Sequence, residues 1–361
     1  MPAVPARLPP GDKNDRNKPA TYWGEDKTML NRKTMLDRRS FSALAGVAFA
    51  ALLATSAQAQ NVTLRSTDIH PTDYPTVEAV RHMGKLLEER TQGRIKINVF
   101  HSAQLGQEKD TIDQTRFGVI DINRINMAPF NNLIPATNVP SLPFIFRSVE
   151  HMRKVMDGKI GDDLLKDFEK HDLIGLAFYD SGSRSFYNSK KAINTPADMK
   201  GMKIRVQQSD MFVALVSALG ANATPMPFGE VYSALQTGVI DGAENNWPSY
   251  ESTRHFEVSK FYSVTEHSLS PEVLVMSKKS FDKFNAADQA LIKAAAKESV
   301  VKMRELWDAR EKASEAKVKA GGAQVNAVEK QPFIDAMKPV YDKFVTDAKL
   351  KDMVAAIQAV K

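Results

Sequence analysis

Residues 234–247 read ALQTGVIDGAENNW. The first of them continue a helical apolar pattern, and Gly238 ends it because glycine readily adopts the left-handed backbone conformation that closes helices. The segment VIDGAE (239–244) then predicts a strand, which runs into two amides and an indole. The same four letters, Gly-Val-Ile-Asp, occur at 118–121, where they again close an expected helix and open an expected strand.

This echo predicts two halves with the same order of elements. In the first half we expect strands at 62–66, 95–100 and 119–123, with helices at 75–90 and 108–117. In the second half we expect strands at 202–206 and 239–244, with helices at 210–219 and 229–237. Alternating strands and helices favour a largely parallel sheet in each half. Duplication of one plan explains the echo, and a chance four-letter match is the alternative.

The fold class is therefore α/β, with two lobes joined by hinge strands and a long helix. Ligands of open α/β sheets bind beyond the carboxyl ends of the strands, so we expect a ligand between the lobes. Residues 286–320 predict the long helix, and 338–361 predict two shorter helical segments. The expected domains are an N-terminal extension and signal peptide at 1–59, lobe I at 60–181 plus 271–310, and lobe II at 182–270 plus 311–361.

Charge and composition exclude several classes of function. The chain has 361 residues and a formal net charge of +6. Residues 1–59 hold nine basic and five acidic side chains, which leaves 40 basic and 38 acidic side chains in the rest. The high pI thus reflects the N-terminal segment and gives no support to nucleic-acid binding. There are no cysteines, which excludes disulfides, zinc thiolate sites, iron–sulfur clusters and cysteine nucleophiles.

The N-terminal region has the pattern of an export signal. Arg38-Arg39 precede an apolar stretch at 41–54, and Ala57-Gln58-Ala59 forms a small-x-small cleavage pattern. A twin-arginine signal and an ordinary Sec signal both fit this pattern. We expect the mature protein to begin at Gln60 and to work in the periplasm.

Several segments together resemble a known family. KIRVQQSD (203–210) and ATPMPFGEVYSALQTGVIDGAENNW (223–247) look like the periplasmic solute-binding proteins of TRAP transporters, the DctP-like family. RIKINVFHSAQLGQEKD (94–110) and VPSLPFIFRS (139–148) strengthen the resemblance, which covers about residues 60–345. It implies a bilobal periplasmic binding protein fold, no catalysis, no cofactor or metal, and delivery of an organic acid to a membrane permease.

Two arginines are the leading ligand-binding candidates. Arg205 lies in an alternating apolar strand, where a charge needs a partner, and its guanidinium can grip a carboxylate with two parallel hydrogen bonds. An exposed strand position is the alternative. The resemblance places the carboxylate-binding arginine of the family at Arg205. It places a second ligand-facing arginine at Arg184, which we expect in a loop after a strand at 174–179 and which could instead be a surface residue.

The remaining candidates follow the expected strands and turns. Asn245 and Asn126 come after the two Gly-Val-Ile-Asp turns and could face one crevice or cap loops. Glu108 could contact ligand, as the resemblance implies, or favour the helix dipole as an N-terminal acid. The other candidates could contact the ligand or have a structural role. They are Asp68 and His70 after the first strand, where a turn is the alternative for His70, Gln208 three residues after Arg205, and Phe228 and Trp247, which could be cleft walls or core residues.

The amides and aromatic rings favour a polyhydroxylated acid as the ligand. The segments STDIHP (66–71), INRINMAP (122–129) and FYDSGSRSFYN (178–188) resemble family members that take hexuronates such as D-glucuronate or D-galacturonate. C4-dicarboxylates, other sugar acids and aromatic acids remain alternatives. We expect a monomer whose partners are this small acid and the permease, with no nucleic acid.

An enzyme is the competing class of function. A secreted enzyme acting on acid sugars could use Arg205, His70 and Glu108. The chain has no Gly-x-Ser-x-Gly, phosphate-binding glycine loop or His-Glu-x-x-His motif, so we expect a binding protein.

Overall fold

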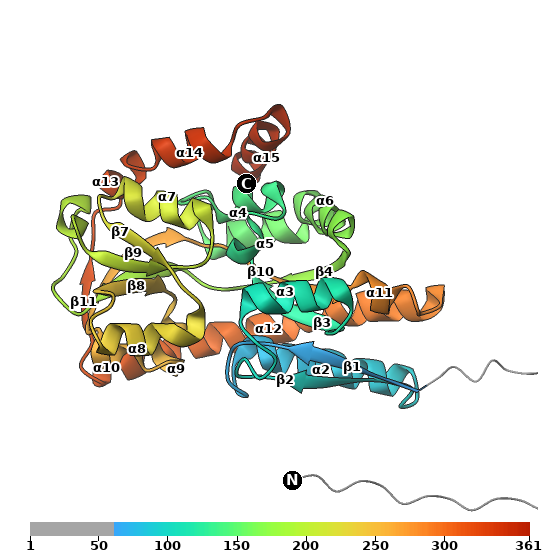
Figure 1. Cartoon of the computed structure of the whole chain (residues 1–361). Helices are drawn as coiled ribbons and strands as arrows, with labels where there is room; N and C mark the ends of the chain where they lie inside the picture. The colour runs from blue at the N-terminus through green and yellow to red at the C-terminus, as the bar shows by residue number, and fades with distance from the viewer. Residues whose placement is uncertain (1–60) are drawn as a thin grey trace, which may run out of the picture. The chain divides into compact units, whose positions relative to one another are not determined.

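Two sheets organise residues 61–361, the part of the chain that this computed structural model describes (Figure 1). The described residues belong to one compact unit. The predicted export signal, with Arg38-Arg39 and the cleavage site, lies outside the described residues, as does Gln60.

The first sheet is built from β1 (Val62–Thr67), β2 (Ile95–Phe100), β3 (Ile122–Asn126), β4 (Leu173–Tyr179) and β10 (Glu272–Ser277). The strand order is β2-β1-β3-β10-β4. β1 is parallel to β2 and β3, whereas β10 is antiparallel to β3 and β4. The prediction of a largely parallel sheet is thus correct for β1–β3 only, because β10 returns from the second half of the chain and inserts between β3 and β4.

The second sheet is built from β5 (Arg184–Asn188), β6 (Lys203–Val206), β7 (Asn222–Pro225), β8 (Gly242–Asn245), β9 (Phe261–Ser268) and β11 (Gln324–Ala327). Its order is β11-β9-β5-β8-β6-β7. The strands β6, β7 and β8 are parallel, and β5 is antiparallel to both β8 and β9. Each half therefore has a parallel core of three strands with one antiparallel strand beside it. Three strands were predicted for the first half, whereas β7 of the second half and both antiparallel strands were not predicted.

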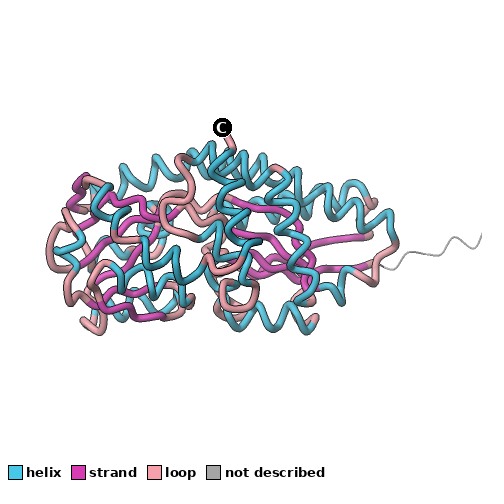
Figure 2. The backbone as a smooth tube through the Cα atoms, turned by 90° about the horizontal axis from the view of Figure 1, so that it is seen from above, coloured by secondary structure: helices cyan, strands magenta, loops and turns pink. Residues whose placement is uncertain are grey.

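Helices surround both sheets, as the tube view shows (Figure 2). The helices that precede β4 in the chain are α2 (Pro75–Arg90), α3 (Glu108–Phe117), α4 (Asn138–Ser141), α5 (Val149–Asp157) and α6 (Lys159–Asp167). Those between β6 and β9 in the chain are α7 (Asp210–Ala218), α8 (Val231–Gln236), α9 (Trp247–Ser252) and α10 (His255–Val258). The later ones are α11 (Lys278–Phe281), α12 (Ala286–Ala320), α13 (Gln331–Asp335), α14 (Lys338–Phe344) and α15 (Ala348–Ala359). The helices predicted at 75–90, 108–117 and 286–320 have these bounds.

The chain passes between the halves after β4 and again after β9. At the first crossing Gly182 has a φ of +60°, and a Cβ there would lie 2.7 Å from Oε1 of Glu311. The 35-residue helix α12 packs on α2 and β4 of the first half and on α9 of the second. The predicted bilobal α/β architecture is confirmed, with crossing strands and a long helix linking the lobes, while the predicted domain limits stay a prediction.

The two Gly-Val-Ile-Asp turns make equivalent hydrogen bonds. The backbone N–H of Asp121 donates to the carbonyl of Arg65, and its Oδ2 accepts from the Arg65 N–H at 2.7 Å. Asp241 makes the same pair with Lys203, and its Oδ2 accepts the Lys203 N–H at 2.9 Å. Each aspartate thereby fastens the start of its own strand to the parallel neighbour, β3 to the later part of β1 and β8 to the first residue of β6. The echo is a repeated structural device.

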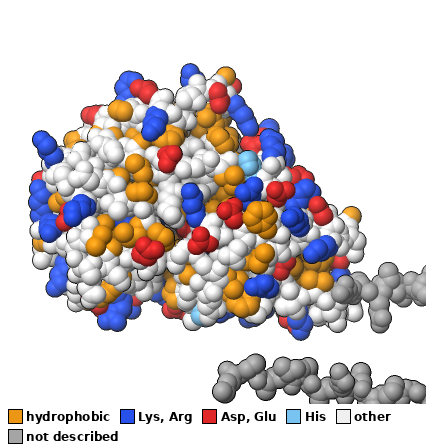
Figure 3. Space-filling view, viewed as in Figure 1, with side chains coloured by type: hydrophobic (Ala, Val, Ile, Leu, Met, Phe, Trp, Pro, Cys, Tyr) orange, Lys and Arg blue, Asp and Glu red, His pale blue; other side chains and the backbone are white. Residues whose placement is uncertain are grey.

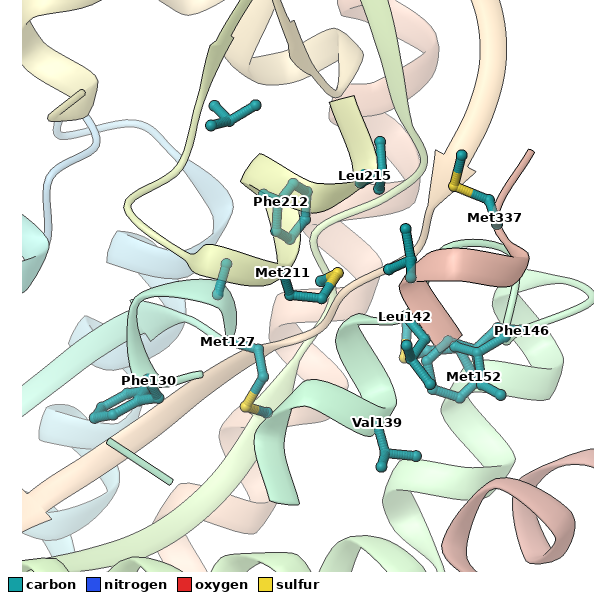
Figure 4. Packing of buried hydrophobic residues seen from close by; sticks show 14 of the residues in the cluster. Met127, Phe130, Val139, Leu142, Phe146, Met152, Met211, Phe212, Leu215 and Met337 are labelled. Atoms are coloured by element: carbon teal, nitrogen blue, oxygen red, sulfur yellow. The ribbon is translucent and has the colours of Figure 1, made fainter. Parts of the chain in front are cut away.

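One apolar cluster contains side chains from both halves and from the C-terminal segment (Figure 4). Met127 and Phe130 follow β3, Met211 and Phe212 come from α7, and Met337 precedes α14; all five are at most 2% exposed. α14 packs on α7, and α15 packs on α4 and α6. The C-terminal helices thus contact both halves.

The surface mixes charges of both signs. On the face drawn in Figure 3, basic and acidic side chains alternate with uncharged ones. This agrees with the near balance of charge outside residues 1–59. Within residues 61–361, no helix combines the length and the apolar character needed to cross a bilayer.

Candidate ligand-binding site

A small cavity that opens to solvent lies where the carboxyl ends of β3, β6 and β8 meet. Seven of the ten predicted site residues line it: His70, Glu108, Asn126, Arg184, Arg205, Phe228 and Asn245. Five further lining residues were not predicted: Ile69, Arg124, Gln207, Ser249 and Glu272. Both sheets contribute, so the cavity lies between the two halves.

Arg205 is a buried cation without a protein anion. It sits near the end of β6 and is 4% exposed. Its Nε and Nη2 donate to the carbonyl of Met226 at 3.0 and 2.7 Å, and within residues 61–361 no carboxylate forms an ion pair with it. Burial lowers the pKa of Arg205, yet a guanidinium stays charged in proteins. Its Nη1 has no hydrogen-bond partner among residues 61–361, so this nitrogen can donate to an anion bound in the cavity.

Arg184 is also buried, but protein groups satisfy it. Both carboxylate oxygens of Glu244 accept from it, with Nη2 to Oε1 at 2.8 Å, and its Nη1 donates to Oδ1 of Asn245 at 2.9 Å. Arg184 begins β5, so the predicted loop position is wrong: the bend of the chain ends earlier, and the strand starts at this residue. Burial raises the pKa of Glu244, but Arg184 and His267 outweigh it and hold that pKa at about 2.

Arg184 orients the amide of Asn245. Oδ1 of Asn245 accepts from Arg184 and from the backbone N–H of Asn246 at 2.9 Å. Because the oxygen is occupied in this way, Nδ2 is the atom left to donate into the cavity. Arg184 therefore positions a ligand donor in addition to lining the cavity.

Arg124 holds three carboxylates on the wall formed by the first half. Asp68 accepts from Nη2 and Nε, Glu272 accepts from Nη1 at 2.6 Å, and Glu108 accepts from the same Nη1 at 3.2 Å. The side chain of Arg124 is fully buried. Three acids around one guanidinium leave an excess of negative charge on this wall.

The carboxyl of Glu272 carries the clearest sign of that excess. Burial raises its pKa to about 7; Arg124 opposes the shift, and the charges of Asp68 and Glu108 add to it. The pKa of Asp68 is lowered, because Arg124 and His70 outweigh the effect of burial. Glu272 thus holds its proton more tightly than an ordinary glutamate does.

Two buried polar atoms at the cavity have no partner among residues 61–361. They are Nδ1 of His70 and Nε2 of Gln207, whose residues are 4% and 5% exposed. The His70 ring stacks on Tyr74 with centroids 3.7 Å apart, and burial is the main cause that lowers its pKa to about 3. His70 is therefore neutral at physiological pH. Buried polar atoms are nearly always hydrogen-bonded, so both atoms are candidates for ligand contact.

Three predicted residues lie outside the lining. Asp68 lies behind Arg124 and accepts from it. Trp247 begins α9 and stacks on Tyr262 with centroids 3.7 Å apart, so it packs against the core of the second half. Gln208 is replaced in the lining by Gln207, because side chains of an extended segment alternate and residue 207 shares the face of residue 205.

The same alternation could have identified Arg124, which lies two residues before Asn126 on β3. No local signal identifies Glu272, since it reaches the cavity only because β10 pairs with β3, with Glu272 opposite Asn126. Ile69 and Ser249 likewise lie in segments with no distinguishing pattern.

Contacts between the halves surround the cavity. Tyr74 OH and Ser249 Oγ are 3.0 Å apart, Gly229 N–H donates to Gln107 at 3.2 Å, and the Ser209 hydroxyl donates to Asn131 at 2.7 Å. These bonds join segments that belong to different sheets. The described arrangement is thus one in which the halves meet over the site.

This geometry, with the buried Arg205 facing a cavity between two α/β lobes, agrees with a comparison to known protein families. Residues 67–347 match the model of the bacterial extracellular solute-binding proteins, family 7, also called DctP. The chain belongs to this family. The predicted membership of this family is confirmed, and the protein is a periplasmic solute-binding protein of the TRAP type.

Solved structures and a curated relative support the assignment. A TRAP periplasmic solute-binding protein from Bradyrhizobium sp. BTAi1, crystallised with α/β-D-galacturonate, is 57% identical; the match covers 82% of this chain and 99% of that one, with a TM-score of 0.81. One from Roseobacter denitrificans with bound β-D-glucuronate is 43% identical, with coverages of 83% and 100% and a TM-score of 0.81. A solute-binding protein of Chromohalobacter salexigens is 41% identical over 88% of this chain and 94% of its own length.

Proposed function

We propose that this protein captures a hexuronate, D-galacturonate or D-glucuronate, in the periplasm and delivers it unchanged to the permease of a TRAP transporter. The observation that carries the proposal is the buried guanidinium of Arg205, which lines the cavity and has no carboxylate partner among residues 61–361. Solute-binding proteins 57% and 43% identical to this chain were crystallised with these two acids.

The chemistry of the cavity suits such a ligand. Arg205 supplies a charged donor for a carboxylate, and Asn245 Nδ2 and Gln207 Nε2 supply neutral donors beside it. Carboxylates of Glu108 and Glu272 accept hydrogen bonds from sugar hydroxyls. Phe228 offers a ring, with its centroid 5.9 Å from Cζ of Arg205, against which a sugar face can pack. A ligand bound here is largely removed from water, which strengthens each of these interactions.

The ligand is proposed to be bound and released without a chemical step. We also propose that the N-terminal segment directs export and is then removed, and that the mature protein acts as a monomer with no nucleic-acid partner. The near balance of charge outside residues 1–59 supports the last point.

A panel of acids tests the ligand. Purified mature protein is melted with D-galacturonate, D-glucuronate, succinate, malate and benzoate, because a ligand that binds the native state raises the melting temperature by mass action. We expect the two hexuronates to give the largest rise, with the acid recovered unchanged by chromatography. A rise with succinate or malate alone would refute the hexuronate assignment, and consumption of the acid would point to an enzyme.

A further inference from the structure

The two walls of the cavity differ in net charge. On the wall from the second half, Arg184 and Glu244 neutralise each other, and Arg205 adds one uncompensated positive charge. His255 and His267 lie near these residues, and burial lowers the pKa of both, so neither adds charge at neutral pH. This wall is therefore cationic by one unit.

The opposite wall is anionic. Arg124 is the cation of this cluster, and it pairs with the carboxylates of Asp68, Glu108 and Glu272. With all three acids ionised the cluster carries two negative charges, and with Glu272 protonated it still carries one. Glu108 and Glu272 line the cavity itself, so this excess faces the ligand.

We infer that this polarity makes the protein selective for acids with a single carboxylate, and that Glu108 and Glu272 are the residues that reject a second one. The inference rests on the proposed function and deepens it. A bound hexuronate places its carboxylate at Arg205 and turns its hydroxyls toward the acidic wall. An acid with a carboxylate at each end must place one of them against Glu108 and Glu272.

Burial makes this rejection strong. Glu272 is 2% exposed, and the side chain of Glu108 is 12% exposed. Like charges placed together at a desolvated contact are strongly unfavourable, whereas hydroxyl donors to ionised carboxylates form short, strong hydrogen bonds. The same two side chains therefore favour hydroxyls and disfavour carboxylates. Arg124 does not reverse the outcome, because its guanidinium already serves three acids.

The test compares D-galacturonate with galactarate, which has a second carboxylate where galacturonate has its aldehyde group. Binding of both is measured by calorimetry, with galactarate also measured by competition, for the native sequence and for Glu108→Gln. Glutamine keeps an acceptor oxygen and removes the charge. We expect the native protein to prefer galacturonate by roughly a hundredfold or more and the variant to narrow this ratio by roughly tenfold.

The comparison of ratios removes other differences between the two acids. Galacturonate closes into a ring and galactarate does not, but this contributes equally to the native protein and the variant. Glu272→Gln gives a second, independent reading at the other lining acid. Glu305→Gln is the matched control, since Glu305 is an exposed α12 residue paired with Lys302, and we expect its ratio to equal that of the native protein.

Equal affinity of the native protein for both acids overturns the inference. So does a ratio that stays unchanged in both Glu108→Gln and Glu272→Gln while the melting temperatures show that the variants are folded. A native protein that binds neither D-galacturonate nor D-glucuronate overturns the proposed function instead, which separates the two failures. If D-glucuronate alone binds, the same comparison is made between D-glucuronate and glucarate.

Discussion

Arg205 and Arg184 line the same cavity but differ in the protein groups that their guanidinium groups contact. Both are buried arginines of the second half, and both line the cavity. Glu244 forms an ion pair with Arg184, whereas in the described part of the chain Arg205 donates only to the carbonyl of Met226. The difference shows that burial of an arginine does not by itself mark a ligand site. What distinguishes Arg205 is a buried cation that forms no ion pair with any of residues 61–361.

Replacing Arg205 should have the largest effect on binding. Arg205→Met leaves the ligand carboxylate buried without its partner, which costs on the order of 3–5 kcal/mol and lowers hexuronate affinity by roughly two to three decades or more. Folding should survive, because no protein anion is left unpaired. Calorimetry and a urea melt measure the two properties. Arg254→Met, at an exposed arginine, is the control, and near-native affinity in Arg205→Met would contradict the comparison.

Replacing Arg184 should have the opposite balance of effects. Arg184→Met strands the buried carboxylate of Glu244, so the free energy of unfolding should fall by about 3–5 kcal/mol. The double variant Arg184→Met with Glu244→Gln should recover part of this loss, because the uncompensated charge is gone. Urea denaturation measures both. If the single variant is as stable as the native protein, Arg184 and Arg205 do not differ as described.

The acidic wall should give a smaller, pH-dependent effect. The pKa of Glu272 is raised to about 7 from 4.5, so between these values the folded state binds more protons than the unfolded state. The stability contributed by this group is therefore present at low pH and falls as pH rises from about 4.5 to about 7. Arg124, Asp68 and Glu108 face this carboxyl and keep its environment charged.

Glu272→Gln should flatten that decline by on the order of 2 kcal/mol. Melts at a series of pH values from 5 to 8 measure it. Glu311, whose pKa burial also raises to about 7, has the same sign, so part of the decline should remain in the variant. An identical slope in the native protein and Glu272→Gln would show that Glu272 does not titrate in this range.

The two Gly-Val-Ile-Asp turns should give the smallest effects, and these should match. Asp121→Ala and Asp241→Ala each remove the carboxylate that accepts a strand N–H. We expect each to lower the free energy of unfolding by about 1–2 kcal/mol and to leave hexuronate affinity unchanged. Chemical denaturation and calorimetry measure these. A loss at one turn only would mean that the repeated letters do not perform equivalent roles.

Local patterns predicted much of the fold. Apolar spacing placed α2, the closing Gly118 placed α3, and a stretch rich in Ala, Lys and Glu placed α12, all at the bounds that the structure has. Each of these signals lies within or next to its own helix. The inserted strand β10 was missed, because its place between β3 and β4 depends on pairing with residues far away in the sequence.

The site divides in the same way. Arg205 stands out in sequence as a charge within an apolar strand, and period-two alternation would also have indicated Gln207 and Arg124. Glu272 lines the cavity only because β10 pairs with β3, so no pattern in the sequence near Glu272 indicates its place in the site. Whether Arg205 and Arg184 had partners could not be read from sequence either. The pairing of β5 with β8 places Glu244 opposite Phe186, two residues along β5 from Arg184, so that the two charged side chains meet.

The C-terminal helices have a consequence for the whole cycle of capture and release. α14 rests on α7 of the second half, while α15 rests on α4 and α6 of the first. This strap ties the two lobes together on the outside of the molecule. If the lobes separate to admit a ligand, the contact of α14 with α7 or that of α15 with α4 and α6 has to change. The free energy of opening is then set partly by residues that do not contact the ligand. Affinity in this protein can therefore be tuned from its last two dozen residues.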